Sequence, residues 1–273
     1  MIDGQRHRKD LVTAPERADY GIDAPAVVRN LLLVGVAGFL LWLSALVGLW
    51  SGNIPLPIPG QDVTLSLTGT GLGVGVLCLA MAAWMLWDSK VGKYRSSERL
   101  LDRITWRGDE QVLDVGCGRG LLLIGAARRL TSGTATGIDI WQSVDLSGNR
   151  RQATLDNAVR EGVSERVKVE SANMRRMPFA PETFDVVVSR AAIHNLYQAD
   201  DRLQALQEIV RVLKKGGVAL IDDIRHIDQY AAAFARLGCS DIQRYGSRFE
   251  AFVLMLITWG SLHPGVLVVR KDS

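Results

Sequence analysis

Two long apolar runs without a polar face dominate the hydrophobic pattern of the first part of the chain. They cover residues 30–50 and 68–87, about 20 residues each, and a helix of that length crosses roughly 30 Å of hydrocarbon. From Asn30 to Leu86 the sequence contains no Lys or Arg and one acidic residue, Asp62. The pattern predicts a transmembrane helical hairpin over residues 30–87.

A cleaved signal peptide and a pair of buried core helices are the competing interpretations of these runs. About thirty mostly polar residues precede the first run, and no short apolar segment with a small-residue cleavage site is present, which argues against a signal peptide. Both runs are apolar on every face, and no other oily elements are available to surround them as core. In the second run Gly71 and Gly75 form a GxxxG spacing, which lets helices approach closely but is common by chance in glycine-rich spans.

The distribution of basic residues predicts the orientation of the hairpin. The connection between the two runs contains no Lys or Arg, whereas basic residues precede the first run and follow the second. By the positive-inside rule, both termini and everything after Trp87 face the cytoplasm, and the integral membrane part ends there. The three prolines of the connection predict an irregular loop on the outside. The basic residues are Arg6, Arg8, Lys9, Arg17 and Arg29 before the hairpin, and Lys90, Lys93, Arg95, Arg99, Arg103 and Arg107 after it.

Beyond Trp87 an amphipathic segment over residues 96–106 is followed by short apolar runs that alternate with helical patterns. Such alternation is typical of an α/β doubly wound sheet, here with seven strands. These sheets bind ligands at the carboxyl ends of their strands, so the loops after the first five strands should converge on one crevice. The expected strands are 111–115, 134–139, 166–170, 184–189, 218–222, 241–245 and 266–270, and the expected helices are 120–130, 148–161, 201–213 and 228–237.

Charge and cysteine content exclude some classes of function. A formal net charge of +3, with the positive excess close to the apolar runs, gives no basic face for nucleic acid. Cys78, Cys117 and Cys239 lie far apart, with no CxxC and no His at metal-ligand spacing. We therefore expect a reducing compartment, no metal site and no nucleic-acid partner.

The stretch VLDVGCGRG, residues 112–120, follows the first expected strand and leads into a helix. Gly116, Gly118 and Gly120 permit a tight turn and a close approach of backbone N–H groups to a ligand. A dinucleotide-binding loop has the pattern GxGxxG, with its third glycine one residue later. Here Asp114 precedes GxGxG, a pattern that suits a cofactor with a cationic sulfonium and an amino-acid moiety.

Three further segments follow this loop in order: TGIDIW, FDVVVSRAAIHNL and VLKKGGVALIDD. With them, the chain from about residue 97 to 270 resembles the class I S-adenosylmethionine-dependent methyltransferases, of the small-molecule and quinone-type subgroup. The resemblance implies a Rossmann-like methyltransferase sheet and S-adenosylmethionine as the cofactor. In this family the acid that matches Asp139 pairs with the ribose hydroxyls. The family's acid near the adenine amino group is replaced by Asn173, whose amide oxygen can accept the same hydrogen bond. The implied cofactor-binding residues are Asp114, Gly116, Cys117, Gly118, Gly120, Asp139, Ile140, Asn173, Met174 and Ser189.

His194 is the candidate catalytic residue, because it follows the fourth strand where this family lines the acceptor pocket. It is placed to take a proton from a phenol, a hydroxyquinone or an amine, whereas a thiolate acceptor needs no base. A histidine that only shapes the pocket is the alternative. Methyl transfer is an in-line displacement that gains much of its rate from positioning and from the exclusion of water. Asp222 and Asp223 end the fifth strand, where one of them is expected to face the acceptor, and Arg190 and His226 are further candidates.

An apolar insertion at about residues 248–263 separates the last two expected strands. It is too short to span a membrane and is typical of an interfacial, re-entrant or buried segment. If the sixth strand is parallel, the insertion leaves from the cofactor edge of the sheet and is expected to rim the acceptor pocket. An additional core helix is the alternative.

The sequence therefore predicts a membrane-anchored methyltransferase that acts on a lipophilic small molecule, such as a quinone precursor, an isoprenoid or a lipid. Its expected partners are that acceptor and membrane lipid. Two alternatives stay open: a methyltransferase for a soluble metabolite or thiol, and a non-catalytic membrane protein that binds the cofactor. The expected organisation is a cytoplasmic segment at 1–29, the hairpin at 30–87, and the methyltransferase domain at 88–273, with its own core and crevice.

Overall fold

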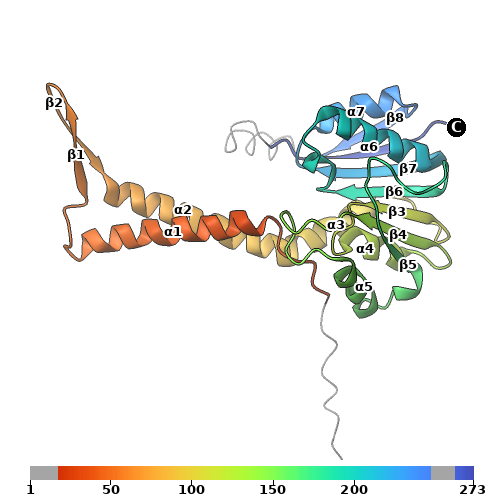
Figure 1. Cartoon of the computed structure of the whole chain (residues 1–273), viewed down its shortest axis with the longest axis horizontal. Helices are drawn as coiled ribbons and strands as arrows, with labels where there is room; N and C mark the ends of the chain where they lie inside the picture. Colours follow the sequence, from red (N-terminus) through yellow and green to blue (C-terminus); the bar gives the residue numbers. More distant parts are fainter. Residues whose placement is uncertain (1–17, 247–261) are drawn as a thin grey trace, which may run out of the picture.

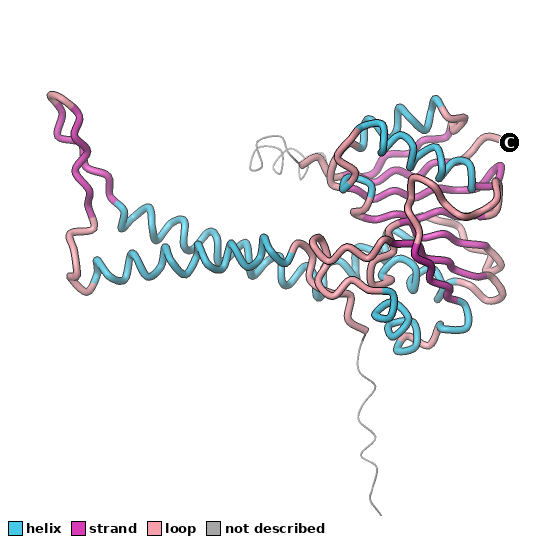
Figure 2. The backbone as a smooth tube through the Cα atoms, in the orientation of Figure 1, coloured by secondary structure: helices cyan, strands magenta, loops and turns pink. Residues whose placement is uncertain are grey.

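The computed structural model of the chain describes residues 18–246 and 262–273, which form a long helical hairpin joined to a seven-stranded sheet. The hairpin projects from one side of the sheet domain, as the backbone trace shows (Figures 1 and 2). Most of the apolar insertion expected at 248–263 lies outside the described residues, as do the basic residues up to Arg17. The expectation that this insertion rims the acceptor pocket therefore stays a prediction.

Two helices, α1 and α2, form the hairpin, and both are long and apolar enough to cross a membrane by length and composition. Proline at the start of α1 has no N–H to leave unpaired in the first turn, which explains why the helix begins five residues before the apolar run. The elements of the hairpin are α1 (Pro25–Leu46), β1 (Asn53–Ile58), β2 (Gln61–Ser66) and α2 (Leu67–Trp87).

Glycines bring α1 and α2 into close contact. A Cβ atom built on Gly38 would lie 2.6 Å from the carbonyl oxygen of Gly71, and one on Gly75 would lie 3.0 Å from the backbone nitrogen of Phe39. No larger residue fits at these distances without moving a helix. The GxxxG spacing of Gly71 and Gly75 thus lies at the helix–helix contact, as small residues do in packed transmembrane helices.

The expected irregular loop between the two helices is instead a two-stranded antiparallel ribbon, so that prediction is wrong. Pro55 and Pro57 lie on alternate residues of β1, opposite Thr64 and Asp62. In a ribbon of two strands every second N–H points away from the partner, which lets prolines two residues apart be accommodated. Gly60 has φ +78° after a proline, which fits a type II turn between the strands.

The sheet confirms the expected doubly wound, seven-stranded α/β arrangement. Its strand order is β5-β4-β3-β6-β7-β9-β8, and β9 alone runs antiparallel to its neighbours. The sixth strand, β8, is therefore parallel to the first five, which meets the condition set in the sequence analysis. Most strand bounds agree with the sequence prediction, but β7 begins five residues earlier, beside a register shift in β6. The strands are β3 (Gln111–Val115), β4 (Thr134–Asp139), β5 (Val167–Ser171), β6 (Phe184–Arg190), β7 (Leu213–Asp223), β8 (Asp241–Tyr245) and β9 (Gly265–Arg270).

Helices cover both faces of the sheet, and each face has its own apolar core. Alternate residues of one strand serve the two cores, because side chains point to opposite faces along a strand. Leu113 packs with α6 and α7, whereas Val112 packs with α3, α4 and α5. The helices are α3 (Lys93–Leu101), α4 (Leu121–Arg129), α5 (Arg151–Arg160), α6 (Ala199–Val212) and α7 (Ile227–Arg236), with short helical turns η2 (Ser164–Arg166) and η3 (Ile193–Asn195).

The second hairpin helix does not stop at the sheet domain. It passes through one π-helical turn, η1 (Asp88–Gly92), into α3, so that residues Leu67–Leu101 form one continuous helix. The expected amphipathic helix at 96–106 is the last part of this arm, and it ends earlier. Leu101 packs on Gly125 of α4, and Glu98 pairs with Arg129 at 3.2 Å. The hairpin is therefore fixed to the sheet domain through a packed helix.

Candidate crevice at the ends of the parallel strands

The glycine loop lies between β3 and α4, at the carboxyl end of the central strand. Gly116, Gly118 and Gly120 have φ values of +76°, +52° and +89°. This left-handed backbone conformation is strained for any residue that has a side chain. A Cβ atom on Gly116 would also lie 2.4 Å from the Cβ of Ala192, in the loop after β6. Both the backbone conformation and the space available therefore require glycine here.

Backbone hydrogen bonds fasten this loop to the end of β4. The N–H groups of Gly116 and Cys117 donate to the carbonyl of Ile138, at 2.8 and 3.0 Å. The side chain of Cys117 packs on Gly137, away from solvent, and burial raises the pKa of its thiol well above the usual value. Any contact of Cys117 with a cofactor would therefore come from its backbone.

Asp139 ends β4 and holds two loops together. Its carboxylate accepts the N–H of Gly118 at 2.8 Å, the N–H of Trp141 at 2.6 Å, and a weaker bond from Asn149 at 3.3 Å. A carboxylate offers about four lone-pair positions, so it can still accept hydroxyl donors. The residue expected to bind the ribose hydroxyls thus also positions the glycine loop.

Asp114 lies beneath the loop, buried within β3. Burial raises its pKa to about 8, although the N–H of Leu123 donates to it, and the nearby charge of Asp139 acts in the same direction as burial. A cation bound nearby would favour the charged carboxylate and lower this pKa.

The remaining predicted cofactor residues surround the same crevice in different ways. The Cβ atom built on Gly116 lies 3.7 Å from the methyl carbon of Met174, and Ile140 is exposed at the end of β4. The side-chain oxygen of Asn173 accepts the N–H of Arg175 at 2.9 Å, and so caps a turn after β5. Ser189 is buried, and its hydroxyl donates to the carbonyl of Val115 at 2.8 Å. Met174 thus lies beside the glycine loop and Ile140 is open to solvent, whereas Asn173 and Ser189 hydrogen-bond to the backbone.

His194 lies in η3, after β6, and its ring is held by a carboxylate at the end of β7. The Nδ1 atom lies 2.5 Å from Oδ1 of Asp223, which is 1% exposed. Asp223 also accepts the backbone N–H groups of His194 and Ile224, at 3.0 and 2.8 Å. A carboxylate at Nδ1 fixes the imidazole tautomer and leaves Nε2 as the proton acceptor. The sequence offered Asp223 only as one of two strand-end acids, without a partner.

The neighbouring acid has a different partner. Asp222 pairs with Arg190 at 3.2 Å; burial raises the pKa of Asp222, and the guanidinium opposes that effect. Arg190 also donates to the carbonyl of Lys93 at 2.9 Å and to the hydroxyl of Ser97. The end of β6 is thereby joined to α3, which places the foot of the hairpin at the candidate crevice. His226 precedes α7, and burial lowers its pKa.

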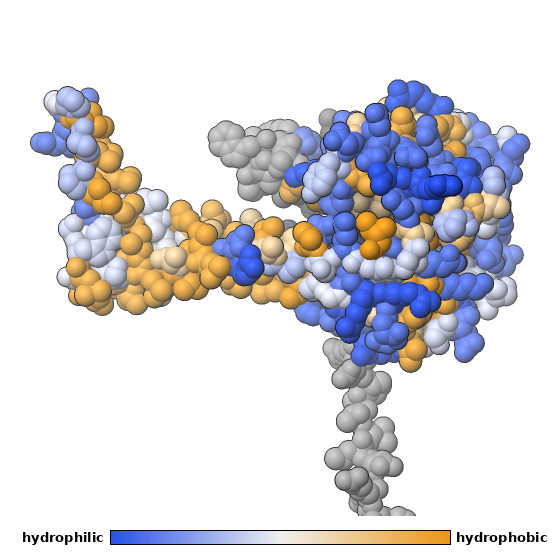
Figure 3. All heavy atoms as spheres, in the orientation of Figure 1, coloured by the Kyte–Doolittle hydropathy of each residue, from blue (hydrophilic) through white to orange (hydrophobic). Residues whose placement is uncertain are grey.

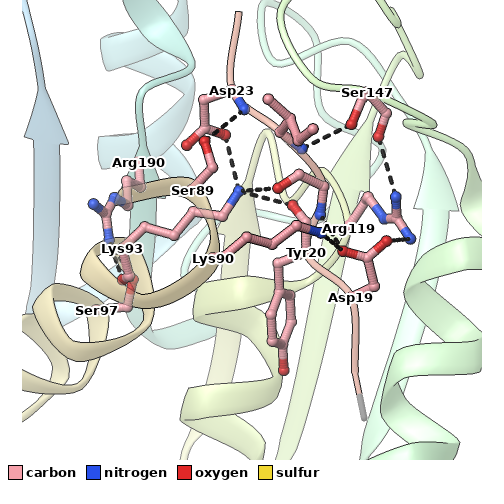
Figure 4. A network of polar contacts seen from close by, with 12 residues as sticks. Asp19, Tyr20, Asp23, Ser89, Lys90, Lys93, Ser97, Arg119, Ser147 and Arg190 are labelled. Carbon is pink, nitrogen blue, oxygen red and sulfur yellow. Dashed lines mark hydrogen bonds and ion pairs between the residues drawn. The ribbon is translucent and has the colours of Figure 1, made fainter. Parts of the chain in front are cut away.

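A segment missed by sequence reasoning also reaches the crevice. Residues 19–24, called the strap below, pass over the loop that follows β4 (Figure 4). The N–H of Ala24 donates to the carbonyl of Asp145 at 2.8 Å, and the N–H of Ser147 donates to the carbonyl of Ile22 at 3.0 Å. The strap has neither helical nor strand periodicity, so its position had no signal in the sequence.

Comparison with known proteins identifies the domain that carries this crevice. Residues 113–221 match the family model described as a methyltransferase domain. The methyltransferase GfsG of Streptomyces halstedii is 33% identical over 130 residues, which are 48% of this chain and 43% of that protein. The ubiquinone/menaquinone biosynthesis C-methyltransferase UbiE of Geobacter sulfurreducens is 33% identical over 119 residues, 43% of either chain. The crystal structure of YcgJ from Bacillus subtilis, 15% identical, has a TM-score of 0.50 over 66% of this chain and 99% of that one.

The comparisons show a methyltransferase domain within residues 113–221, and the likeness to YcgJ confirms the predicted Rossmann-like fold. The matches span half or less of the first curated relatives, at 43%, 50% and 32% of their lengths. The family match begins at residue 113 and leaves the hairpin outside it.

Proposed function

We propose that the chain is a membrane-anchored methyltransferase that transfers a methyl group from S-adenosylmethionine to a lipophilic small molecule. The observation that carries the proposal is the contact between Arg190, at the end of β6, and the α3 part of the long helix. Through it, the apolar hairpin, which projects from one side of the sheet domain (Figure 1), is joined to the end of β6. The glycine loop follows β3, and the His194–Asp223 pair lies at the ends of β6 and β7.

The chemistry of the crevice suits this cofactor. The turn formed by Gly116, Gly118 and Gly120 leaves room for close approach, Asp139 can accept ribose hydroxyls, and Asp114 supplies a carboxyl group for a cationic ligand. When bound, the cofactor supplies an electrophilic methyl group on a sulfonium. The residues of the chain bind it, orient it and exclude water from it.

The His194–Asp223 pair suits an acceptor that loses a proton. As the acceptor oxygen or nitrogen bonds to the methyl group, Nε2 of His194 takes the released proton. The carboxylate of Asp223 at Nδ1 then stabilises the imidazolium. A phenol or hydroxyquinone acceptor fits this arrangement.

The exposed apolar surface of the hairpin supports a membrane location for the protein. Only 11% and 17% of the most apolar windows of the two long helices are buried, so among the described residues they do not form a core. Leu33 and Leu77 are 63% and 66% exposed, and apolar residues cover most of the visible hairpin surface (Figure 3). A surface of this kind requires lipid or a partner. The basic residues after Trp87 favour a cytoplasmic sheet domain.

A groove along α1 adds support for an apolar ligand. Its volume is about 590 Å³, and none of its lining residues is among the predicted cofactor-binding residues. Arg29 is the one charged residue among those that line it, and Ile22 of the strap closes one part of the lining. Such a surface suits an acyl or isoprenoid chain rather than a soluble metabolite. The lining is Ile22, Pro25, Val28, Arg29, Leu32, Leu33, Val36, Ala37, Leu40 and Leu86.

The name of the Geobacter sulfurreducens relative refers to quinone biosynthesis, which favours a quinone precursor among lipophilic acceptors. A soluble metabolite or thiol is the second candidate acceptor. The proposal is tested with purified full-length protein in vesicles, by flotation, by calorimetric titration with S-adenosylhomocysteine, and by turnover. Flotation, binding and turnover together support it. Binding without turnover on a total membrane lipid extract would favour a soluble acceptor or a non-catalytic cofactor-binding protein, and protein that stays in the aqueous fraction would refute the anchor.

A further inference from the structure

A buried lysine joins the strap to the foot of the hairpin. Lys93, at the start of α3, is 4% exposed. Its ammonium group donates to the carbonyls of Tyr20 and Gly21, both at 2.9 Å, and to the carboxylate of Asp23 at 3.0 Å. Burial lowers the pKa of Lys93, and the charge of Asp23 opposes that effect. All three donors of this amine are therefore used by one short segment, as Figure 4 shows.

The opposite side of the strap forms hydrogen bonds with the loop after β4. The N–H of Ile22 donates to the hydroxyl of Ser147 at 2.7 Å, and the N–H of Ser147 returns a bond to the carbonyl of Ile22. The preceding residue of that loop, Leu146, lies over the glycine loop. A Cβ atom on Gly118 would be 2.8 Å from its side chain. The strap thus supports the loop that covers Gly118.

Asp19 attaches the strap to the glycine loop itself. Its carboxylate pairs with Arg119, the residue between Gly118 and Gly120, at 3.1 Å, and with Lys90 at 2.8 Å. Arg119 also donates to the carbonyl of Ser147 at 3.2 Å. One strap residue therefore contacts both the glycine loop and the foot of the hairpin.

The contact between the strap and the crevice loops leaves no spare room. Gly21 has φ +77°, and a Cβ atom on it would lie 2.8 Å from the carbonyl oxygen of Ser147 and 3.1 Å from the side chain of Arg119. Any side chain at Gly21 would therefore push the strap away from these two residues. Neither of them belongs to the predicted set of cofactor ligands.

We propose that the strap is a wall of the cofactor site, and that Lys93 is a positioning residue through which the membrane hairpin sets cofactor affinity. The inference rests on the cofactor site proposed above. The strap leads directly into α1, which begins at Pro25. The second hairpin helix, α2, continues through η1 to Lys93, so each hairpin helix has one end at the strap. Moving the strap away would leave a buried ammonium unpaired, which is costly. The strap, the crevice loops and the hairpin feet therefore move as one unit.

Gly21→Ala and Gly60→Ala form a matched pair of variants for the test. Both glycines have a left-handed φ, +77° and +78°, but nothing lies within 4 Å of a Cβ on Gly60, in the distant ribbon turn. In the full-length protein, Gly21→Ala should raise the Kd for S-adenosylhomocysteine roughly tenfold or more, and Gly60→Ala should leave it unchanged. Both variants carry the same backbone strain, so a difference between them reports the contact with Ser147 and Arg119.

Lys93→Met and Lys90→Met separate a buried cation from an exposed one on the same helix. Lys93→Met should weaken S-adenosylhomocysteine binding roughly tenfold or more, whereas Lys90→Met should change it by less than about fivefold, because its ion pair is exposed. Hydrogen exchange gives a readout that a purely structural role would not move. In the wild type, bound S-adenosylhomocysteine should slow exchange of the Ile22 and Ala24 amides, and Lys93→Met should remove that effect.

Two results would overturn the inference while leaving the proposed function intact. One is a folded Gly21→Ala protein with the wild-type Kd for S-adenosylhomocysteine. The other is hydrogen exchange at the Ile22 and Ala24 amides that is the same with and without the ligand. If Lys93→Met does not fold, the comparison of Gly21→Ala with Gly60→Ala and the hydrogen exchange of the wild-type protein still test the inference. If the wild type itself does not bind S-adenosylhomocysteine, the proposed function falls, and the inference falls with it.

Discussion

At the scale of single residues, the hydrogen bond between His194 and Asp223 is the contact most closely tied to chemistry. Replacing His194 with Ala should lower kcat by about 10²- to 10⁴-fold for an acceptor that loses a proton, because the variant lacks the proposed general base. Affinity for S-adenosylhomocysteine should stay the same, since the crevice loops do not depend on the ring. Steady-state kinetics and calorimetry on one preparation check both statements. An unchanged kcat would identify His194 as a residue that only shapes the pocket.

Asp139 makes a different prediction, because its proposed role is to bind the cofactor rather than the acceptor. Charge-assisted hydrogen bonds to the ribose contribute about 1.5–3 kcal/mol, so Asp139→Ala should weaken binding by about ten- to a hundredfold. The loss should be equal for S-adenosylmethionine and S-adenosylhomocysteine, since both carry the ribose. The variant also loses the acceptor for the N–H of Gly118, which acts in the same direction. A loss confined to the methylated form would argue against this role.

The raised pKa of the buried Asp114 carboxyl predicts that the stability of the protein depends on pH. Burial raises its pKa to about 8, from an ordinary value of 3.8. Between these two values the folded protein keeps a proton that the unfolded chain has released, so the free energy of unfolding falls as the pH rises through this window. One such group contributes a slope of about 1.4 kcal/mol per pH unit at most.

Replacing Asp114 with Asn should remove this slope from the ligand-free protein. Thermal unfolding in detergent at about pH 5 and about pH 8 measures it as a difference between wild type and variant. The Tm difference between the two pH values should be smaller in Asp114→Asn. An identical pH dependence in the two proteins would mean that the carboxyl is not held neutral by burial.

The sequence predicted those residues whose roles follow from local patterns. Gly116, Gly118 and Gly120 need their left-handed backbone because of the turn they form, and Asp139 ends a strand whose apolar pattern is plain. The pairing of His194 with Asp223, 29 residues apart, depends on β6 and β7 lying side by side with their ends in register. Local spacing contains no information on that contact.

At the scale of elements, Gly75 should determine the packing of the hairpin. A side chain there meets the backbone of α1 at 3.0 Å, whereas nothing lies within 4 Å of a Cβ on Gly73 of the same helix. Both changes to Leu replace a poor helix former with a good one. Gly75→Leu should therefore separate the helices and lower the Tm in detergent, and Gly73→Leu should not. Equal Tm values for the two variants would mean that the glycine contact does not hold the helices together.

Element type and order could be read from the periodicity of apolar residues, and nearly all strands and helices of the sheet lie where the pattern predicts them. The structure of two connections could not be predicted in this way. The ribbon of β1 and β2 contains prolines, which normally argue against strands, and it tolerates them because both of its strands are edges. The continuity of α2 with α3 depends on a π-helical turn at Asp88–Gly92, which has no apolar signature.

At the scale of the whole molecule, the strap makes the hairpin more than a tether. Residues 19–24 lie before the first helix in the chain but contact the loops of the crevice, so a domain that starts at residue 88 would lack one wall of the proposed cofactor site. Its apolar cores would remain, because nearly all of their residues follow Trp87. Such a truncated domain is therefore expected to fold and to bind cofactor more weakly than the full chain.

The partition of labelled product tests the central claim of a membrane-delivered acceptor most directly. Full-length protein in vesicles that contain a total membrane lipid extract is incubated with methyl-labelled S-adenosylmethionine, beside Gly118→Val, whose side chain would collide with Leu146 and strain a left-handed backbone. The account predicts label in the organic phase with the wild type and none with the variant. Label that appears only in an aqueous product, or that does not depend on Gly118, would contradict it.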